Sequence, residues 1–140
     1  MKNPGSSPPA QGRTNPSRRI LLVDDEIHMR KRMVKTLCQL GCENVDTASN
    51  GAEAWEALHN VSYSLVITDH RMPRLTGLEL IGRMRSEGMA QPVILISGML
   101  PTDEIKRDPG LRVDAILPKP FSVATLSVTL GKFLRAEGAI

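Results

Sequence analysis

The stretch RILLVDD (residues 19–25) places four consecutive aliphatic residues directly before two carboxylates. A short aliphatic run without polar alternation is typical of a strand that is buried on both faces, and such strands form parallel sheets covered by helices. Two further runs, SLVITD (residues 64–69) and PVILIS (residues 92–97), repeat the pattern and end on an acid or a hydroxyl. The sequence therefore predicts buried strands in the interior of a parallel sheet.

Segments with helical periodicity separate the aliphatic runs. The expected strands are residues 19–24, 44–48, 64–68, 92–97 and 114–117, and the expected helices are residues 27–40, 50–59, 77–87, 102–106 and 122–136. Five strands that alternate with five helices predict an α/β fold, in which helices cover both faces of a parallel sheet.

Local signals mark where several helices begin and end. Thr76 and Ser122 are suited to cap the helices that follow them, and Gly41 is suited to end the first helix. The fourth helix is expected to be short and polar, because Asp108-Pro109-Gly110 interrupts it. On the first helix we expect an apolar face made of Ile27, Val34, Leu37 and Cys38.

The first 18 residues differ in composition from the rest of the chain. They are rich in Pro, Gly, Ser and Asn and cannot bury enough apolar surface to become ordered. We expect residues 1–18 to be a disordered tail or linker and residues 19–138 to be the folded domain. Residues 1–19 carry four basic side chains and no acidic one; since the net charge of the chain is +3, the remainder carries −1. The basic character belongs to the tail, and direct nucleic-acid binding is not expected.

Other broad features favour a cytoplasmic protein. The two cysteines, Cys38 and Cys42, form no C-x-x-C motif and fit a reduced protein better than a disulfide framework or a zinc site. No apolar run approaches the length of a membrane span, and the N-terminus lacks the hydrophobic core of a signal peptide. We therefore expect a cytoplasmic domain without membrane contact, either a monomer or a weak dimer.

Polar residues at the ends of the predicted strands form one set. Asp24 and Asp25 follow the first strand, Asp69 follows the third, Ser97 ends the fourth and Lys119 follows the fifth. Functional groups gather beyond the carboxyl ends of parallel strands, so these side chains are expected to converge. Crowded carboxylates repel unless a cation intervenes, and Mg²⁺ prefers oxygen ligands that include carboxylates and phosphates. A carboxylate can also accept a phosphoryl group.

Four motifs, ILLVDDE, VITDHRMPRLTGLEL, VILISG and LPKPF, resemble in order and spacing the response-regulator receiver domains of two-component signalling. The resemblance covers residues 19–136 and implies a flavodoxin-like, doubly wound sheet of five parallel strands in the order 2-1-3-4-5. It also implies a cis peptide bond before Pro120. The implied site comprises Asp69 as phosphoacceptor, Asp24, Asp25 and Asp69 as metal ligands, the backbone carbonyl of Arg71 as a further ligand, Ser97 as the switch hydroxyl and Lys119 as the contact of the phosphoryl group.

The function that the resemblance implies is that of a phosphoryl-accepting signalling module. A sensor histidine kinase or a histidine phosphotransfer protein would phosphorylate Asp69 in a Mg²⁺-dependent reaction, and an unknown downstream partner would then bind differently. Such a module assists its own phosphorylation and dephosphorylation but is not an enzyme. It acts alone, relays the phosphoryl group, or is the terminal receiver of a hybrid kinase.

Two features depart from the pattern of the family. Receivers often carry Tyr or Phe three residues before the lysine, where this chain has Ile116, which has no ring to reorient when the hydroxyl residue moves. The short fourth helix is the second departure. The basic run Arg30-Lys31-Arg32-Lys35 is expected to be a solvated helix face, with contact to a phosphotransfer partner as the alternative, and His70 is expected to be exposed.

Two other classes of function stay open on sequence grounds. A constitutive interaction module with a receiver fold would be favoured by missing site residues, and none is missing. An enzyme of the haloacid-dehalogenase phosphatase type needs Asp-x-Asp after its first strand, whereas this chain has adjacent Asp24 and Asp25. A flavodoxin-like FMN protein needs a neutral hydroxyl-rich loop at that place, because an acidic pair repels the phosphate.

The position of Arg71, two residues after the acceptor, generates the first prediction. Its side chain is placed to cover the phosphoryl group and hinder an attacking water, so we expect autodephosphorylation over hours and not seconds. Replacing Arg71 with Asn should speed the loss of phosphate, which is measured by timing phosphate release after removal of the donor. An unchanged or slower rate in the variant contradicts the hypothesis.

Overall fold

The computed structural model describes residues 19–99 and 101–134. The predicted tail, residues 1–18, and the expected ends of the last helix and of the domain, residues 136 and 138, lie outside the described residues. Within the described part of the chain, no helix is long and apolar enough to cross a membrane.

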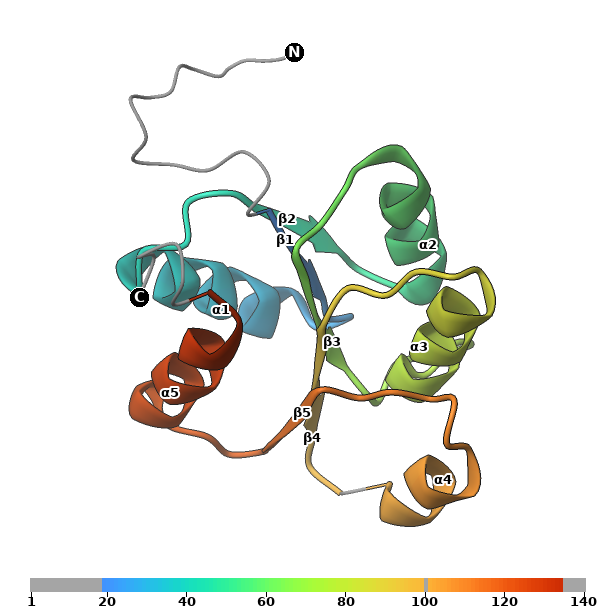
Figure 1. The fold of residues 1–140 in the computed structure, drawn as a ribbon. Helices are drawn as coiled ribbons and strands as arrows, with labels where there is room; N and C mark the ends of the chain where they lie inside the picture. The colour runs from blue at the N-terminus through green and yellow to red at the C-terminus, as the bar shows by residue number, and fades with distance from the viewer. Residues whose placement is uncertain (1–18, 100, 135–140) are drawn as a thin grey trace.

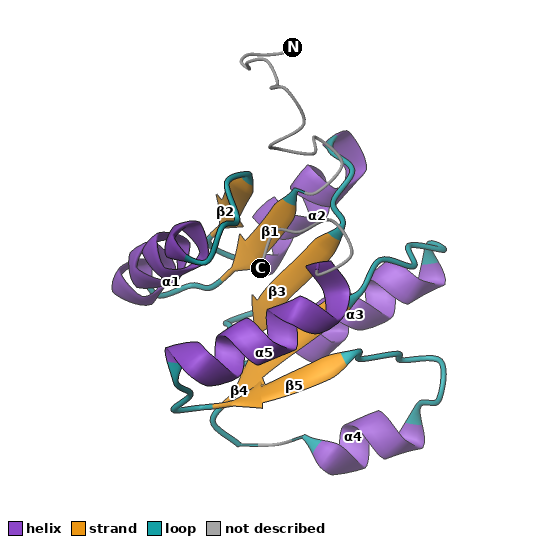
Figure 2. Ribbon diagram, turned by 60° about the vertical axis from the view of Figure 1, so that its left-hand side comes forward, coloured by secondary structure: helices purple, strands orange, loops and turns teal. Residues whose placement is uncertain are grey.

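Parallel strands form the centre of the molecule, in the spatial order β2-β1-β3-β4-β5 (Figures 1 and 2). They are β1 Ile20–Val23, β2 Val45–Ala48, β3 Leu65–Asp69, β4 Val93–Ser97 and β5 Ala115–Pro118. The first strand lies between two others, because Ile20 pairs with both Val45 and Leu65. The predicted α/β class and the implied strand order are confirmed, and the predicted ends of the strands differ from the observed ends by about one residue.

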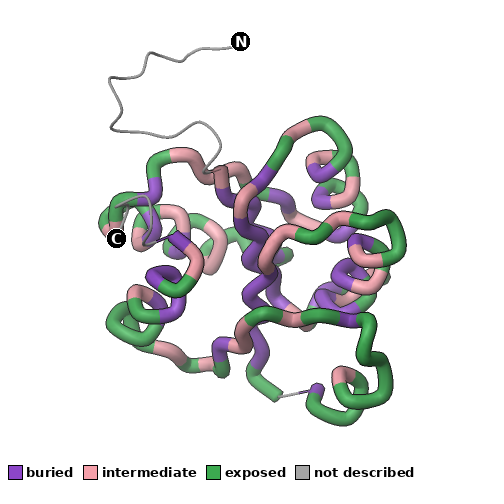
Figure 3. The backbone as a smooth tube through the Cα atoms, viewed as in Figure 1, coloured by how far each residue is buried: buried purple, intermediate pink, exposed green. Residues whose placement is uncertain are grey.

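Helices cover both faces of the sheet. They are α1 Ile27–Gln39, α2 Gly51–Asn60, α3 Gly77–Ser86, α4 Thr102–Arg107 and α5 Val123–Leu134. The helices α1 and α5 lie on one face, whereas α2, α3 and α4 lie on the other (Figure 1). The strands at the centre of Figure 3 are accordingly buried along most of their length, as expected for the interior layer of three.

Successive residues of β1 supply two separate cores. Leu21 and Val23 pack into the core beneath α2 and α3, while Ile20 and Leu22 pack into the core beneath α1 and α5. Each of these four side chains is at most 1% exposed. Because both faces of the strand are covered, every position must be apolar. This requirement explains the unbroken aliphatic run that reveals the fold in the sequence.

The three predicted helix caps, Thr76, Ser122 and Gly41, are confirmed by side-chain and backbone geometry. Thr76 Oγ1 accepts the N–H of Glu79 at 3.2 Å, and the Glu79 carboxylate accepts the N–H of Thr76 at 2.8 Å, a reciprocal capping box. Ser122 Oγ accepts the N–H of Thr125 at 3.0 Å. Gly41, just after α1, has a φ of 97°, a conformation that favours glycine.

The predicted apolar face of the first helix is wrong for two residues. Leu37 is buried and Val34 is half-buried, but Ile27 is 46% exposed and Cys38 is exposed, and Met33 occupies the buried position instead. Met33 and Leu37 are four residues apart and therefore lie on one side of the helix, whereas Cys38 is turned about 100° from Leu37. Ile27 is the first helical residue and lies near the carboxyl edge of the sheet, at the margin of the core.

The helix α4 is weakly fastened, as its short, polar sequence predicts. It has six residues, none of them buried, and among the described residues no side chain caps its first turn. Ile105 alone of its six residues packs against the core, as a partly buried side chain. Little apolar burial therefore fixes the position of this helix.

The segment after α4 is held from a distance by Arg85, near the end of α3. Its Nη1 donates to the carbonyls of Met89 and Gln91, both at 2.9 Å, and its Nη2 donates to the carbonyl of Arg112 at 2.7 Å. The guanidinium also lies 3.2 Å from the Asp114 carboxylate, and the Arg85 side chain is only 9% exposed. One buried cation thus ties the end of α3 to the residues that lead into β4 and β5.

Replacing Arg85 with Ala should lower the free energy of unfolding by about 3 kcal/mol, because carbonyls satisfied by a buried cation lose their donor. Urea denaturation monitored by circular dichroism measures the change. Arg83→Ala is the matched control: Arg83 is exposed on the same helix, and its removal should change stability by less than about 0.5 kcal/mol. Equal effects of the two substitutions would contradict the assigned role of Arg85.

Candidate functional site

The carboxyl ends of the strands bring the predicted site residues to one edge of the sheet. Asp69 is the last residue of β3 and lies opposite Ile96 of β4. Asp24 and Asp25 directly follow β1, Ser97 is the last residue of β4, and Lys119 directly follows β5. The convergence predicted from strand ends is therefore observed in the structure.

Three carboxylates form the centre of the site. One oxygen from each of Asp24, Asp25 and Asp69 lies within 4.8 Å of the others. Asp24 and Asp69 are buried, at 5% and 4% exposure, whereas Asp25 is exposed at the rim. Three oxygen donors of this kind fit a hard divalent cation such as Mg²⁺, which binds through carboxylates and retains waters.

The electrostatics of the cluster explain why a cation suits it. Burial raises the pKa of Asp24 above its ordinary value, and the neighbouring carboxylates of Asp69 and Asp25 raise it further. The backbone N–H of Glu26, which donates to Asp24 Oδ1 at 3.0 Å, and the ammonium of Lys119 act in the opposite direction. The upward shift of the pKa means that the surroundings of Asp24 disfavour its ionised form.

Lys119 supplies the cation nearest to Asp69 among the described residues. Its Nζ lies 2.7 Å from Asp69 Oδ1, which is otherwise buried without a hydrogen-bond partner among those residues. The backbone N–H of Lys119 donates to the carbonyl of Ser97 at 2.9 Å, so the end of β4 positions the lysine. The peptide bond between Lys119 and Pro120 is cis, as the resemblance implied.

Ser97 is buried, at 3% exposure, but its hydroxyl is engaged with the connection between β4 and α4. Its Oγ donates to the carbonyl of Met99 and accepts the N–H of Met99, the latter at 3.2 Å. The hydroxyl therefore fastens the start of this connection.

The remaining predicted positions flank this centre. Arg71 has an exposed side chain on the loop between β3 and α3, and the role of its carbonyl as a metal ligand stays a prediction. Ile116 is half-buried on β5 and lies opposite Leu95 of β4.

Arg30 and His70 differ from their predicted surroundings. Arg30 belongs to the basic run that was expected to be solvated, yet it is half-buried, and its Nη1 donates to the backbone carbonyl of Asp24 at 2.9 Å. His70 was expected to be exposed, but it is half-buried, and its Nδ1 has no hydrogen-bond partner among the described residues. The burial of Arg30 and of His70 arises from tertiary packing beside the carboxylate cluster, so it could not be predicted from residue type alone.

Gly77 is a residue that sequence reasoning missed. A Cβ at this position would lie 2.5 Å from the carbonyl oxygen of Asp69, 2.8 Å from Leu95 Cδ1 and 3.0 Å from the Cα of His70. The N–H of Gly77 donates to the carbonyl of His70 at 2.9 Å. The absence of a side chain therefore lets α3 begin in contact with the backbone that carries Asp69. Its position one residue after the predicted cap Thr76 was the available signal.

Replacing Gly77 with Ala should displace the backbone at Asp69 and lower the free energy of unfolding by about 2 kcal/mol, because the new methyl group meets backbone atoms. Gly82→Ala is the matched control on the same helix, since its Cβ would lie 3.7 Å from Leu111 Cδ1. That control should stabilise the domain by about 0.5–1 kcal/mol, because alanine favours helix. Chemical denaturation of both variants measures the difference, and a neutral Gly77→Ala would refute the packing argument.

Comparison with known proteins identifies relatives of this chain. The model of the response regulator receiver domain matches residues 20–130. The chemotaxis protein CheY1 of Helicobacter pylori is 35% identical over 115 residues, which are 80% of this chain and 93% of that protein. A CpxR homolog of Haemophilus influenzae, a transcriptional regulatory protein, is 37% identical over 123 residues, 86% of this chain. The chain spans only about half, 52%, of that protein and of the transcriptional regulatory protein TctD of Salmonella typhimurium.

Solved structures agree with the sequence comparison. The response regulator TrrA of Thermotoga maritima, determined in complex with Mg²⁺ and BeF, is 32% identical, with a TM-score of 0.72 over 84% of this chain and 99% of that one. The chemotaxis protein CheY4 of Vibrio cholerae is 28% identical, with a TM-score of 0.75 over 84% of this chain and 98% of that one. By its family match, its relatives and its fold, the chain belongs to the response-regulator receiver domains of two-component systems.

Proposed function

We propose that this receiver domain accepts a phosphoryl group on the carboxylate of Asp69, in a reaction that requires Mg²⁺. The observation that carries the proposal is the environment of Asp69 Oδ1. This oxygen is buried, lies 2.7 Å from the ammonium of Lys119, and belongs to a cluster of three carboxylates. A nucleophilic carboxylate beside a fixed cation suits phosphoryl transfer, in which positioning and charge stabilisation account for most of the catalysis.

The proposed donor is the phosphohistidine of a sensor histidine kinase or of a histidine phosphotransfer protein. An oxygen of Asp69 attacks the phosphorus atom, an O–P bond forms, and the P–N bond of the donor breaks. The electron pair of that bond stays on the imidazole nitrogen of the donor, which then takes up a proton. Lys119 would contact an oxygen of the transferred group, and the Ser97 hydroxyl would bind another after leaving Met99.

The cluster provides the oxygen ligands for the cation. Asp24, Asp25 and Asp69 would hold Mg²⁺, with the backbone carbonyl of Arg71 as a further ligand. When bound, the cation offsets the negative charge that accumulates on the phosphoryl oxygens. The TrrA relative was determined with Mg²⁺ and BeF, which supports this choice of cation.

The consequence of phosphorylation is a change in partner binding, and the domain is a signalling module, not a turnover enzyme. It would assist only its own phosphorylation and the later hydrolysis. A module of this kind works in the cytoplasm, where kinases present their phosphohistidine. The downstream partner would recognise the surface that changes when Ser97 moves.

Incubation with acetyl phosphate and Mg²⁺, followed by intact mass spectrometry, tests the proposal. The wild-type domain should gain one phosphoryl group, whereas Asp69→Asn should gain none. Asp24→Asn should require far more Mg²⁺ for the same gain, because a buried metal ligand is lost. The exposed Asp103→Asn on α4 is the control and should behave as wild type. A wild-type domain that stays unmodified under saturating donor would instead favour constitutive partner binding.

A further inference from the structure

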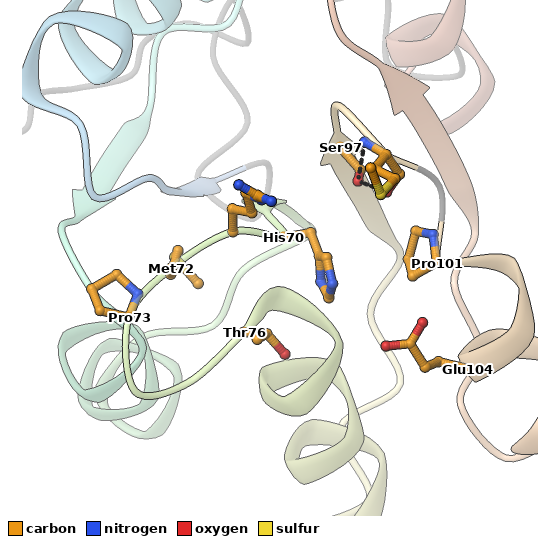
Figure 4. A pocket seen from close by; sticks show the side chains of 9 residues that line it. His70, Met72, Pro73, Thr76, Ser97, Pro101 and Glu104 are labelled. Atoms are coloured by element: carbon orange, nitrogen blue, oxygen red, sulfur yellow. Dashed lines mark hydrogen bonds between the residues drawn. The ribbon is translucent and has the colours of Figure 1, made fainter.

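A groove beside the site joins the loop after β3 to the connection after β4. It has a volume of about 510 Å³. One wall is the β3–α3 loop and the start of α3, and the opposite wall is the end of β4 and the start of α4 (Figure 4). The lining residues that matter here are His70, Thr76, Ser97, Met99, Pro101 and Glu104. The imidazole of His70 projects from the loop into this space, toward the side of Pro101 and Glu104 (Figure 4).

Hydrogen bonds fix the backbone of His70, from which the ring projects into the groove (Figure 4). Its N–H donates to the carbonyl of Ile96 on β4 at 2.9 Å, and its carbonyl accepts the N–H of Gly77 at 2.9 Å. Nevertheless Nδ1 is buried and has no hydrogen-bond partner among the described residues. A buried polar atom without a partner is unfavourable, so a residue that lines the groove carries an unused hydrogen-bonding position.

The opposite wall depends on one hydroxyl. The Oγ of Ser97 binds both the carbonyl and the N–H of Met99, whose side chain is 76% exposed. Beyond Met99, α4 buries none of its residues. If Ser97 turns toward a phosphoryl group on Asp69, as the proposed function requires, both backbone groups of Met99 lose their partner at once.

We propose that His70 is a positioning residue that captures the backbone of Met99 after Ser97 leaves it. In the proposed state the N–H of Met99 donates to Nδ1 of the neutral imidazole, so the released donor and the unused ring nitrogen satisfy one another. Phosphorylation would then move α4 to a second fixed position and not merely loosen it. Ile116 offers no ring for such a role, whereas His70 contributes a polar ring to the groove that Ser97 and Met99 also line.

This inference rests on the proposed function, and beryllium fluoride with Mg²⁺ serves as the probe that imitates the phosphoryl group. Hydrogen–deuterium exchange of the Met99 amide, measured by NMR, reports whether this N–H has a partner. Fluorine NMR of bound beryllium fluoride independently reports whether Asp69 accepts the mimic. Wild-type Met99 should be protected in the free state by Ser97 and in the bound state by His70.

Three variants separate the hydrogen bond from the bulk of the ring. His70→Phe keeps a ring without an acceptor, so Met99 should exchange about tenfold faster than wild type in the bound state and at the wild-type rate in the free state. His70→Asn places an oxygen close to the position of Nδ1 and should restore protection. His59→Phe removes an imidazole from α2, outside the groove, and should have no effect.

Two outcomes overturn the inference while leaving the proposed function intact. One is a wild-type Met99 amide that loses protection when beryllium fluoride binds, and the other is a His70→Phe variant that stays as protected as wild type in the bound state. Absence of a bound fluorine signal in the wild type would instead contradict the proposed function, and the inference would fail with it.

Discussion

The contact between the ammonium of Lys119 and the buried Oδ1 of Asp69, 2.7 Å apart, joins the ends of two strands that are not neighbours. The strand between them, β4, sets this distance. Its Ile96 carbonyl accepts the N–H of His70, and its Ser97 carbonyl accepts the N–H of Lys119. The contact is therefore positioned by the ends of β3, β4 and the edge strand β5, which hydrogen bonds hold together.

The same convergence brings three carboxylates together and disfavours the ionised form of the buried Asp24. The pKa of Asp24 is raised chiefly by burial and then by repulsion from Asp69, although Lys119 lies close by. Arg30 reaches this region but donates to the backbone carbonyl of Asp24 and not to its carboxylate. A divalent cation bound at the rim, beside the exposed Asp25, would offset the charge of these carboxylates.

The sequence predicted the features that depend on strand ends, because a strand buried on both faces is largely aliphatic and a carboxylate or hydroxyl then marks its carboxyl end. Asp24, Asp69 and Ser97 could be found in this way. The burial of Met33 in place of Cys38 could not be read from the first helix, since its basic and apolar residues fit more than one face. The requirement for glycine at residue 77 depends on the Asp69 carbonyl, eight residues earlier in the chain.

The segment that joins β4 to β5 through α4 is held more firmly at its β5 end than at its β4 end. A conformational change should therefore occur mainly at the β4 end. At the far end, Arg85 satisfies the Arg112 carbonyl and pairs with Asp114, so the entry to β5 is held firmly. At the near end the connection depends on the Ser97 hydroxyl, followed by a helix without buried residues. The entry to β5 is anchored, and Ile116 has no ring to reorient. A movement of the Ser97 hydroxyl should therefore displace α4 more readily than β5. Because β5 carries Ile116 in place of the aromatic residue that is common in the family, we expect phosphorylation to change the position of α4, which forms the wall of the groove across from His70.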